Sequence, residues 1–151
     1  FGDSNLLDIS VLPLRPEADD WAFVFAGRNT LTSLRGQPGA PWRLGEADAL
    51  WNLNRDLAVP MGYWGGKAAW AFSIPEASDT GLEVLSGNLY TLLGRVDDSL
   101  FHAHGRAYQL LHWQDMHQYC GRCGSPTSVI EEGRAVACSD CSTRIYPRIS
   151  P

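Results

Sequence analysis

The sequence has no long apolar run, no excess of positive charge and no cysteine outside one short region. Its 151 residues carry 12 Lys and Arg against 17 Asp and Glu, which gives a formal net charge of −5 at pH 7. This charge argues against a broad electrostatic surface for nucleic acid. No apolar stretch approaches the roughly 20 residues of a membrane-spanning helix, and no charged-then-apolar leader opens the chain. We therefore expect no membrane partner.

Two kinds of functional motif are also missing. Neither the G-x-G-x-x-G pattern nor a Walker pattern occurs, so no phosphate-binding loop is predicted. The four histidines, at 102, 104, 112 and 117, include no pair spaced by four. They therefore do not form a helical pair of metal ligands. We expect all four at the surface or the end of a helix.

The cysteines form the strongest pattern in the chain. They occur as two Cys-x-x-Cys pairs with fourteen residues between them: Cys120 with Cys123, and Cys138 with Cys141. Each spacing lets two thiolates reach one ion from a tight turn. Gly121 and Gly124, each directly after a cysteine, favour such turns because glycine adopts unusual backbone dihedrals without steric cost. We predict a zinc ribbon, and the site is structural because four thiolates leave no open coordination position.

Two disulfides, a redox dithiol or four free thiols are the alternatives for these cysteines. Disulfides are typical of small secreted domains that are dense in cysteine, whereas the rest of this chain is rich in Trp, Leu and Val. A redox Cys-x-x-Cys is expected at the start of a helix after a strand. Reduced cysteines suit a reducing compartment, and we expect a cytoplasmic protein.

Before residue 97 the pattern is that of strands and turns. We expect a strand and a proline-rich connection over 1–20, a buried strand over 21–26 paired with 31–35, a loop over 36–48, a hairpin turning at Gly65-Gly66, and one or two strands in 82–93. Residues 51–58 fit either a short helix or a strand.

After residue 97 the apolar spacing becomes helical. Its apolar or small residues are Leu100, Ala103, Ala107, Leu110, Leu111 and Trp113. Asp97 supplies a cap. Gly105 weakens such a helix, so we expect a neighbouring element to pack closely against it. The predicted fold is therefore α+β, with a β-rich domain over 1–96, a connecting helix over 97–118 and a ribbon over 119–147.

The residues from His117 to Thr127, the second cysteine pair and the segment 146–151 together resemble the NADH pyrophosphatases. These are Nudix hydrolases that also remove NAD caps from RNA. The resemblance is specific over 98–151 and loose over 1–97. It implies a non-catalytic Nudix-like domain over 1–96, then the zinc ribbon, then a catalytic Nudix domain that starts at 148–151. We expect that domain beyond Pro151, and a segment ahead of Phe1.

The catalytic signature of that family is not found in the chain. The Nudix box, G-x5-E-x7-R-E-x2-E-E-x-G, has no match, since Glu131-Glu132-Gly133 lacks its arginine and spacing. The resemblance implies that Mg²⁺ or Mn²⁺ binds in the absent domain. We expect no hydrolysis by these residues alone.

The resemblance also implies substrate contacts. Tyr146 falls on the aromatic position that contacts the nucleotide. In the family a ribbon glutamate also contacts the substrate, and its position falls here on Gly133, which leaves Glu132 as a neighbouring candidate. An arginine just upstream of the helix contributes in some members, and Arg95 is its counterpart if a gap is allowed. The implied parent is a homodimer that cleaves NADH or NAD⁺ to NMN(H) and AMP, with NAD-capped RNA as a further substrate.

Two hypotheses follow for the function. The first is a non-catalytic, substrate-positioning part of a zinc-containing NAD(H) diphosphatase. The second is a stand-alone zinc-ribbon adaptor that binds protein or nucleic acid. A Nudix box in the gene sequence after Pro151 would discriminate between them.

Overall fold

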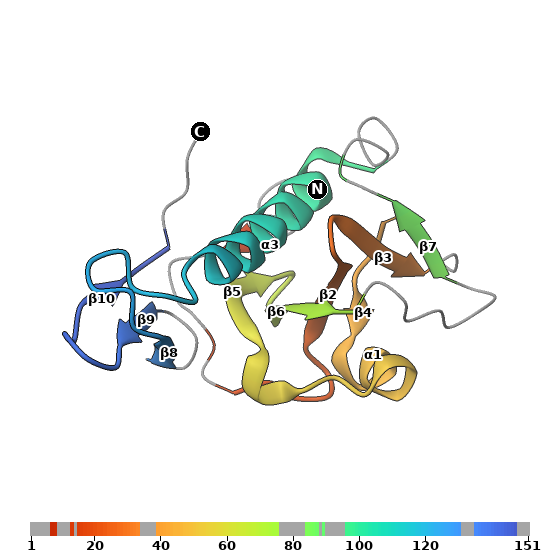
Figure 1. The fold of residues 1–151 in the computed structure, drawn as a ribbon. Helices are drawn as coiled ribbons and strands as arrows, with labels where there is room; N and C mark the ends of the chain where they lie inside the picture. The colour runs from red at the N-terminus through yellow and green to blue at the C-terminus, as the bar shows by residue number, and fades with distance from the viewer. Residues whose placement is uncertain are drawn as a thin grey trace.

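The computed structural model describes residues 7–8, 13, 15–33, 39–75, 84–87, 89, 96–130 and 135–147. Figure 1 shows a large sheet with helices on both sides, and a small separate sheet beyond the C-terminal end of the longest helix. The predicted α+β class is confirmed. No helix in the described ranges is long and apolar enough to cross a membrane.

The elements follow one another as β1 (Leu7–Asp8), β2 (Trp21–Ala26), β3 (Asn29–Ser33), β4 (Trp42–Arg43), α1 (Leu44–Trp51), the short 3₁₀ helix η2 (Arg55–Leu57), β5 (Val59–Trp64), β6 (Lys67–Ile74), β7 (Val84–Gly87), α3 (Asp98–Met116), β8 (Thr127–Ile130), β9 (Ala135–Cys138) and β10 (Arg144–Ile145). The large sheet has the order β1-β5-β6-β2-β3-β7, and β4 also pairs with β2. The small sheet has the order β10-β9-β8. Strands β2 and β6 run parallel at the centre of the large sheet.

The central strand β2 is buried on both faces. Val24 packs in a cluster that includes Leu44 of α1, whereas its neighbour Phe23 packs in a second cluster with Leu100 and Ala103 of α3. Figure 1 shows α1 and α3 on opposite sides of the sheet. A strand covered on both faces reads as a continuous apolar run. This explains why the prediction of a buried strand over 21–26 is confirmed.

Several local predictions within 1–96 are confirmed. The chain turns at Gly65 and Gly66, with φ of +59° and +80°, and Trp64 pairs with Lys67 across the hairpin. Two successive positive φ values define the turn that matches the twist of paired strands. Strand β3 pairs back on β2, and β7 lies within 82–93.

The expected loop over 36–48 is wrong from residue 42 onward. Strand β4 pairs with β2 there, and α1 begins at Leu44. Leu44 and Ala47 are fully buried, so packing on the sheet stabilises a helix that directly follows a segment rich in glycine and proline. The undecided segment 51–58 contains the last residue of α1 and then η2.

The helix predicted over 97–118 is confirmed as α3. The Asp97 carboxylate caps it by accepting a hydrogen bond of 2.9 Å from the Leu100 amide. The close packing expected at Gly105 is wrong, because an added Cβ meets no atom within 4 Å in the described part of the chain.

The expectation of four surface histidines is wrong for His104, which is only 1% exposed. This residue lies on the buried stripe of α3, between Ala103 and Ala107. Its ring hydrogen-bonds Thr30 and the Gly39 carbonyl, so both nitrogens are satisfied inside the core. His102 and His112 are exposed, and His117 is the C-cap of α3.

Candidate metal centre and the groove beside it

Each cysteine pair lies on a tight turn closed by backbone hydrogen bonds. The Cys120 amide donates to the Ser125 carbonyl at 2.8 Å, and the Cys138 amide donates to the Thr143 carbonyl at 2.9 Å. The residue after the second cysteine is left-handed in both turns, as Gly124 in one (φ +80°) and Ser142 in the other (φ +62°). The sequence argument for Gly124 is therefore sound.

The argument for Gly121 is not. Its φ lies outside the left-handed region, and an added Cβ would meet no described atom within 4 Å. The first turn therefore requires glycine at one position, not two.

The four sulfurs converge on one point, since all lie within 4.8 Å of one another. Cys120 and Cys141 have sulfurs 3.7 Å apart, and Cys123 lies 3.3 Å from Cys138 and 3.7 Å from Cys141. A tetrahedron of Zn–S bonds of about 2.3 Å places its sulfurs about 3.8 Å apart. All four thiols are free, so the disulfide alternative does not fit this geometry.

Hydrogen-bond donors surround the sulfurs. The Arg122 amide donates to Cys120 Sγ at 3.4 Å, and the amides of Asp140 and Cys141 donate to Cys138 Sγ at 3.3 and 3.4 Å. Such bonds stabilise thiolates and orient metal ligands. The donor set is therefore the one that a structural zinc site needs.

The pKa values of the thiols differ. Hydrogen bonds with Thr143 lower the pKa of Cys141 to about 6, and the amides of Cys123 and Arg122 lower the pKa of Cys120. For Cys138, the amides of Cys141 and Asp140 favour the thiolate, but burial and hydrogen bonds with Cys123 and Cys141 outweigh them and raise its pKa to about 11. Sulfurs this close do not all ionise without a cation between them, so the cluster suits a divalent metal.

The ribbon is fixed to the end of α3 by two hydrogen bonds from one residue. Thr127 donates from its hydroxyl to the His117 carbonyl at 2.6 Å and from its amide to the Gln118 carbonyl at 2.9 Å. The His117 ring lies 2.7 Å, through Nδ1, from the Trp113 carbonyl one helical turn back. His117 therefore caps the helix.

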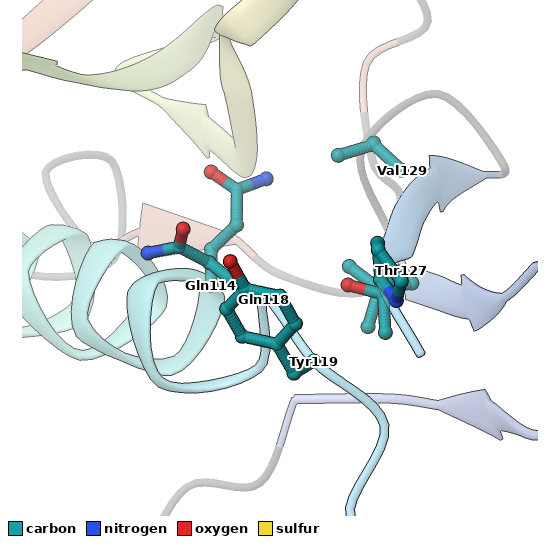
Figure 2. A pocket seen from close by; sticks show the side chains of 7 residues that line it. Gln114, Gln118, Tyr119, Thr127 and Val129 are labelled. Atoms are coloured by element: carbon teal, nitrogen blue, oxygen red, sulfur yellow. The ribbon is translucent and has the colours of Figure 1, made fainter. Parts of the chain in front are cut away.

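A hollow of about 310 Å³ lies at this junction. Figure 2 shows Gln114 and Gln118 at the end of α3 facing Thr127 and Val129 of β8 across it. The Gln118 amide is already bound to the Asp115 side chain at 2.9 Å. None of the described residues that line this hollow is charged.

A larger groove of about 520 Å³ lies between the C-terminal half of α3 and β10. It is lined by Tyr108, Gln109, His112, Trp113, Met116, His117, Ile145 and Tyr146. Tyr146, which the sequence singled out, is 49% exposed there. The helical residues were missed, although two rows at spacing four, 108-112-116 and 109-113-117, were a signal that could have found them.

The other two predicted contacts, Arg95 and Glu132, lie outside the described residues, as does the segment 148–151. They remain predictions from the sequence.

Two parts of the chain match families of known proteins. Residues 19–113 match the NADH pyrophosphatase-like rudimentary NUDIX domain. Residues 115–146, which hold the four sulfurs, match the NADH pyrophosphatase zinc ribbon domain. The chain belongs to the NADH pyrophosphatase family. Its resemblance to that family, argued from the ribbon motifs, is therefore confirmed.

Curated relatives agree with this family. Three relatives are named NAD-capped RNA hydrolase NudC. The one from Deinococcus radiodurans is 32% identical to this chain over the matched residues, the one from Yersinia enterocolitica 34% and the one from Klebsiella pneumoniae 33%. These matches cover 71%, 68% and 76% of this chain but 38%, 37% and 41% of the relatives. The chain thus spans about two fifths of the length of the NADH pyrophosphatase relatives it matches.

In an NADH pyrophosphatase ribbon of this geometry, the four cysteines would hold the zinc. The ion would cross-link the two turns, and its closed shell of four thiolates would leave no position for a reacting water. Because Thr127 donates hydrogen bonds to the carbonyls of His117 and Gln118, the zinc-bound ribbon would be held in a fixed position at the end of α3.

Proposed function

We propose that this chain is the non-catalytic, substrate-positioning part of a Nudix hydrolase. The whole enzyme would cleave the pyrophosphate of NADH or NAD⁺, giving NMN(H) and AMP, and would act on NAD-capped RNA. The observation that carries this proposal is the half-exposed Tyr146 at the groove between α3 and β10. The relatives named NAD-capped RNA hydrolase support it.

The chemistry supports a non-catalytic role. Cleaving a dinucleotide pyrophosphate requires Mg²⁺ or Mn²⁺ held by clustered carboxylates, which neutralise the bridging charge and activate a water. Among the described residues, the His, Cys, Asp and Glu groups close enough to hold a metal are the four cysteines alone. The sequence contains no Nudix box. The carboxylates would therefore come from the remainder of a longer protein.

In this proposal the zinc and the substrate-contacting side chains have different roles. Zinc holds the ribbon rigid, and Tyr146, five residues after Cys141, presents its ring to a nucleotide base. Glu132 and Arg95 are proposed as further contacts to the substrate. We also propose a homodimer as the working assembly, with one zinc in each chain, in a reducing compartment such as the cytoplasm.

The test uses the parent protein extended past Pro151. Stacking of a base on an aromatic ring is worth about 1–3 kcal/mol, so Tyr146→Ala should lower kcat/KM for NADH about tenfold or more. Zinc content should stay unchanged. Tyr119→Ala is the matched control, because Tyr119 is a ribbon tyrosine that is 65% exposed and lies outside the groove. Full activity in Tyr146→Ala would remove the proposed contact.

A second measurement tests where catalysis resides. The 151 residues alone should release no AMP from NADH with Mg²⁺ or Mn²⁺, whereas the parent should. Turnover by the 151 residues would overturn the assignment of catalysis to the remainder. Absence of a Nudix box after Pro151 would favour the adaptor hypothesis instead.

A further inference from the structure

The four cysteines of the metal centre are not equally accessible. The first cysteine of each turn is buried, since Cys120 and Cys138 are each 4% exposed, whereas the second, Cys123 or Cys141, is exposed. The sulfurs of the two exposed cysteines lie 3.7 Å apart, although they come from different turns. A small oxidant that approaches the cluster from solvent therefore meets these two sulfurs first.

Hydrogen bonding distinguishes the two exposed sulfurs from each other. Cys141 Sγ lies 3.0 Å from the Thr143 hydroxyl, and that hydroxyl is the donor when zinc is bound, because a thiolate has no proton to donate. Among the described residues, no amide or hydroxyl donates to Cys123 Sγ. A hydrogen bond that stabilises a thiolate lowers its nucleophilicity. Cys123 Sγ is therefore the stronger nucleophile of the exposed pair.

The buried sulfur nearest to Cys123 is a poorer partner for it than Cys141. Cys138 Sγ lies only 3.3 Å from Cys123 Sγ, but it is buried and accepts hydrogen bonds from two amides. A disulfide requires its two sulfurs to approach to about 2.05 Å. The exposed side chains of Cys123 and Cys141 can rotate toward each other without displacing the packed part of the ribbon. Exposure and hydrogen bonding thus favour a disulfide between Cys123 and Cys141.

We propose that Cys123 and Cys141 are a peroxide-sensitive modification site, whose oxidation to a disulfide opens the zinc site. Cys123 attacks the peroxide and Cys141 then forms the disulfide with it. Thr143 sets this order through its hydrogen bond to Cys141. The modification is independent of the proposed function, because it requires no nucleotide substrate.

The reaction balances with hydrogen peroxide as the oxidant. The Cys123 thiolate attacks one peroxide oxygen, the O–O bond breaks, and the hydroxide that leaves takes up a proton to form water. Cys123 is then a sulfenic acid. The Cys141 thiolate attacks the sulfur of that group, so that an S–S bond forms, the S–O bond breaks and a second hydroxide leaves and is protonated to water. The two sulfurs together lose the two electrons that reduce the peroxide.

Oxidation of these two thiolates should release the metal. Only Cys120 and Cys138 remain as ligands, and two thiolates do not fill the four-coordinate shell of a structural zinc. Zinc binding supplies folding free energy to such a domain, so β8–β10 should lose order with the metal. Reduction of the disulfide and added zinc should restore the ribbon, because a disulfide is a reversible stage of cysteine oxidation.

The test treats the zinc-loaded 151-residue chain with hydrogen peroxide. A chromophoric zinc indicator should show zinc release in step with disulfide formation. Trypsin cleaves after Arg122 and Arg134, and a protease specific for aspartate cleaves before Asp140, so each of the four cysteines falls on its own peptide. Mass spectrometry without reduction should find the crosslink between the peptides that carry Cys123 and Cys141.

Variants of Thr143 and Ser139 test the order of attack. A dione reagent that traps sulfenic acids should label Cys123 in the wild type. In Thr143→Val it should label both Cys123 and Cys141, and zinc release should be about twofold faster, because Cys141 loses the hydrogen bond that lowers its nucleophilicity. Ser139→Ala is the matched control, since the Ser139 hydroxyl donates to the Pro126 carbonyl at 3.0 Å and not to a sulfur. Its rate and labelling should match the wild type.

The outcomes decide both parts of the proposal. Zinc retained in excess peroxide, zinc released without a disulfide, or a crosslink through Cys120 or Cys138 would overturn the modification site. Labelling confined to Cys123 in Thr143→Val would overturn the role of Thr143. None of these readouts involves a nucleotide, so they would stand even if Tyr146→Ala left the parent enzyme fully active.

Discussion

The Nδ1 atom of His104 lies 3.0 Å from the hydroxyl of Thr30, inside the core between α3 and the sheet. On the other side of the ring, Nε2 lies 2.6 Å from the carbonyl of Gly39. A neutral imidazole satisfies both contacts when Nε2–H donates to Gly39 and Nδ1 accepts from Thr30. One side chain thus connects α3, β3 and the turn at Gly39.

This buried histidine should make stability depend on pH. Burial, opposed in part by the hydrogen bond to Gly39, lowers the pKa of His104 from 6.5 to about 4. Between these values the unfolded chain binds a proton that the folded chain does not. The free energy of unfolding should therefore fall as pH falls from 6.5 to 4, by roughly 3 kcal/mol from this residue.

Urea unfolding at several pH values, compared between variants, would measure this effect. His104→Gln cannot titrate, so its stability should be lower near neutral pH but fall less over the same window. His102→Gln, on the exposed face of α3, should keep the wild-type slope. An equal slope in His104→Gln would assign the pH dependence to other groups.

Gly105→Ala should stabilise the protein. An added Cβ at this position meets no described atom within 4 Å, and the residue lies in the middle of α3. Alanine in a helix interior is favoured over glycine by about 1 kcal/mol. Thermal unfolding should show a Tm higher by a few degrees. A lower Tm would mean that Gly105 has a packing role.

The two cysteine turns should respond oppositely to substitution. Ser142 has a left-handed backbone with φ +62°, which is sterically unfavourable for a residue with a Cβ. Ser142→Gly should therefore stabilise the zinc-bound ribbon by a few tenths to about 1 kcal/mol. Gly124 has φ +80°, so Gly124→Ala should destabilise it by about 1 kcal/mol or more. Competition for zinc with a chromophoric chelator would measure both. The same direction of change in both variants would contradict this account.

Removing the metal should unfold the ribbon but not the large sheet. In the described part of 119–147, the fully buried apolar side chains are few, chiefly Ala135 and Val136. A region with so little core depends on its metal. Elemental analysis should give about one zinc per chain. After chelation, amide signals of β8–β10 should collapse while those of β2 and β6 persist. A ribbon that keeps its signals without metal would refute the prediction.

The sequence alone determined the features that depend on short-range geometry. Three motifs each fix a local conformation that has few alternatives. They are the two Cys-x-x-Cys spacings, the Gly65-Gly66 turn and the helical period from Leu100 to Trp113. The cysteine pairs, with the residues around them and the segment 146–151, also carried the family resemblance. Tyr146 was found only through that resemblance, since no spacing rule marks a single tyrosine.

Tertiary structure decided the rest, because contacts distant in sequence outweigh local preference. Leu44 turns a segment rich in glycine and proline into the start of a helix by packing on a sheet that forms elsewhere in the chain. His104 is buried because Thr30, 74 positions away, and Gly39 offer partners for both of its ring nitrogens. The groove exists only once β10 lies near α3, which brings Tyr146 into the same lining as His112 and Trp113. A local sequence pattern cannot predict these contacts, because each joins residues that only the folded chain brings together.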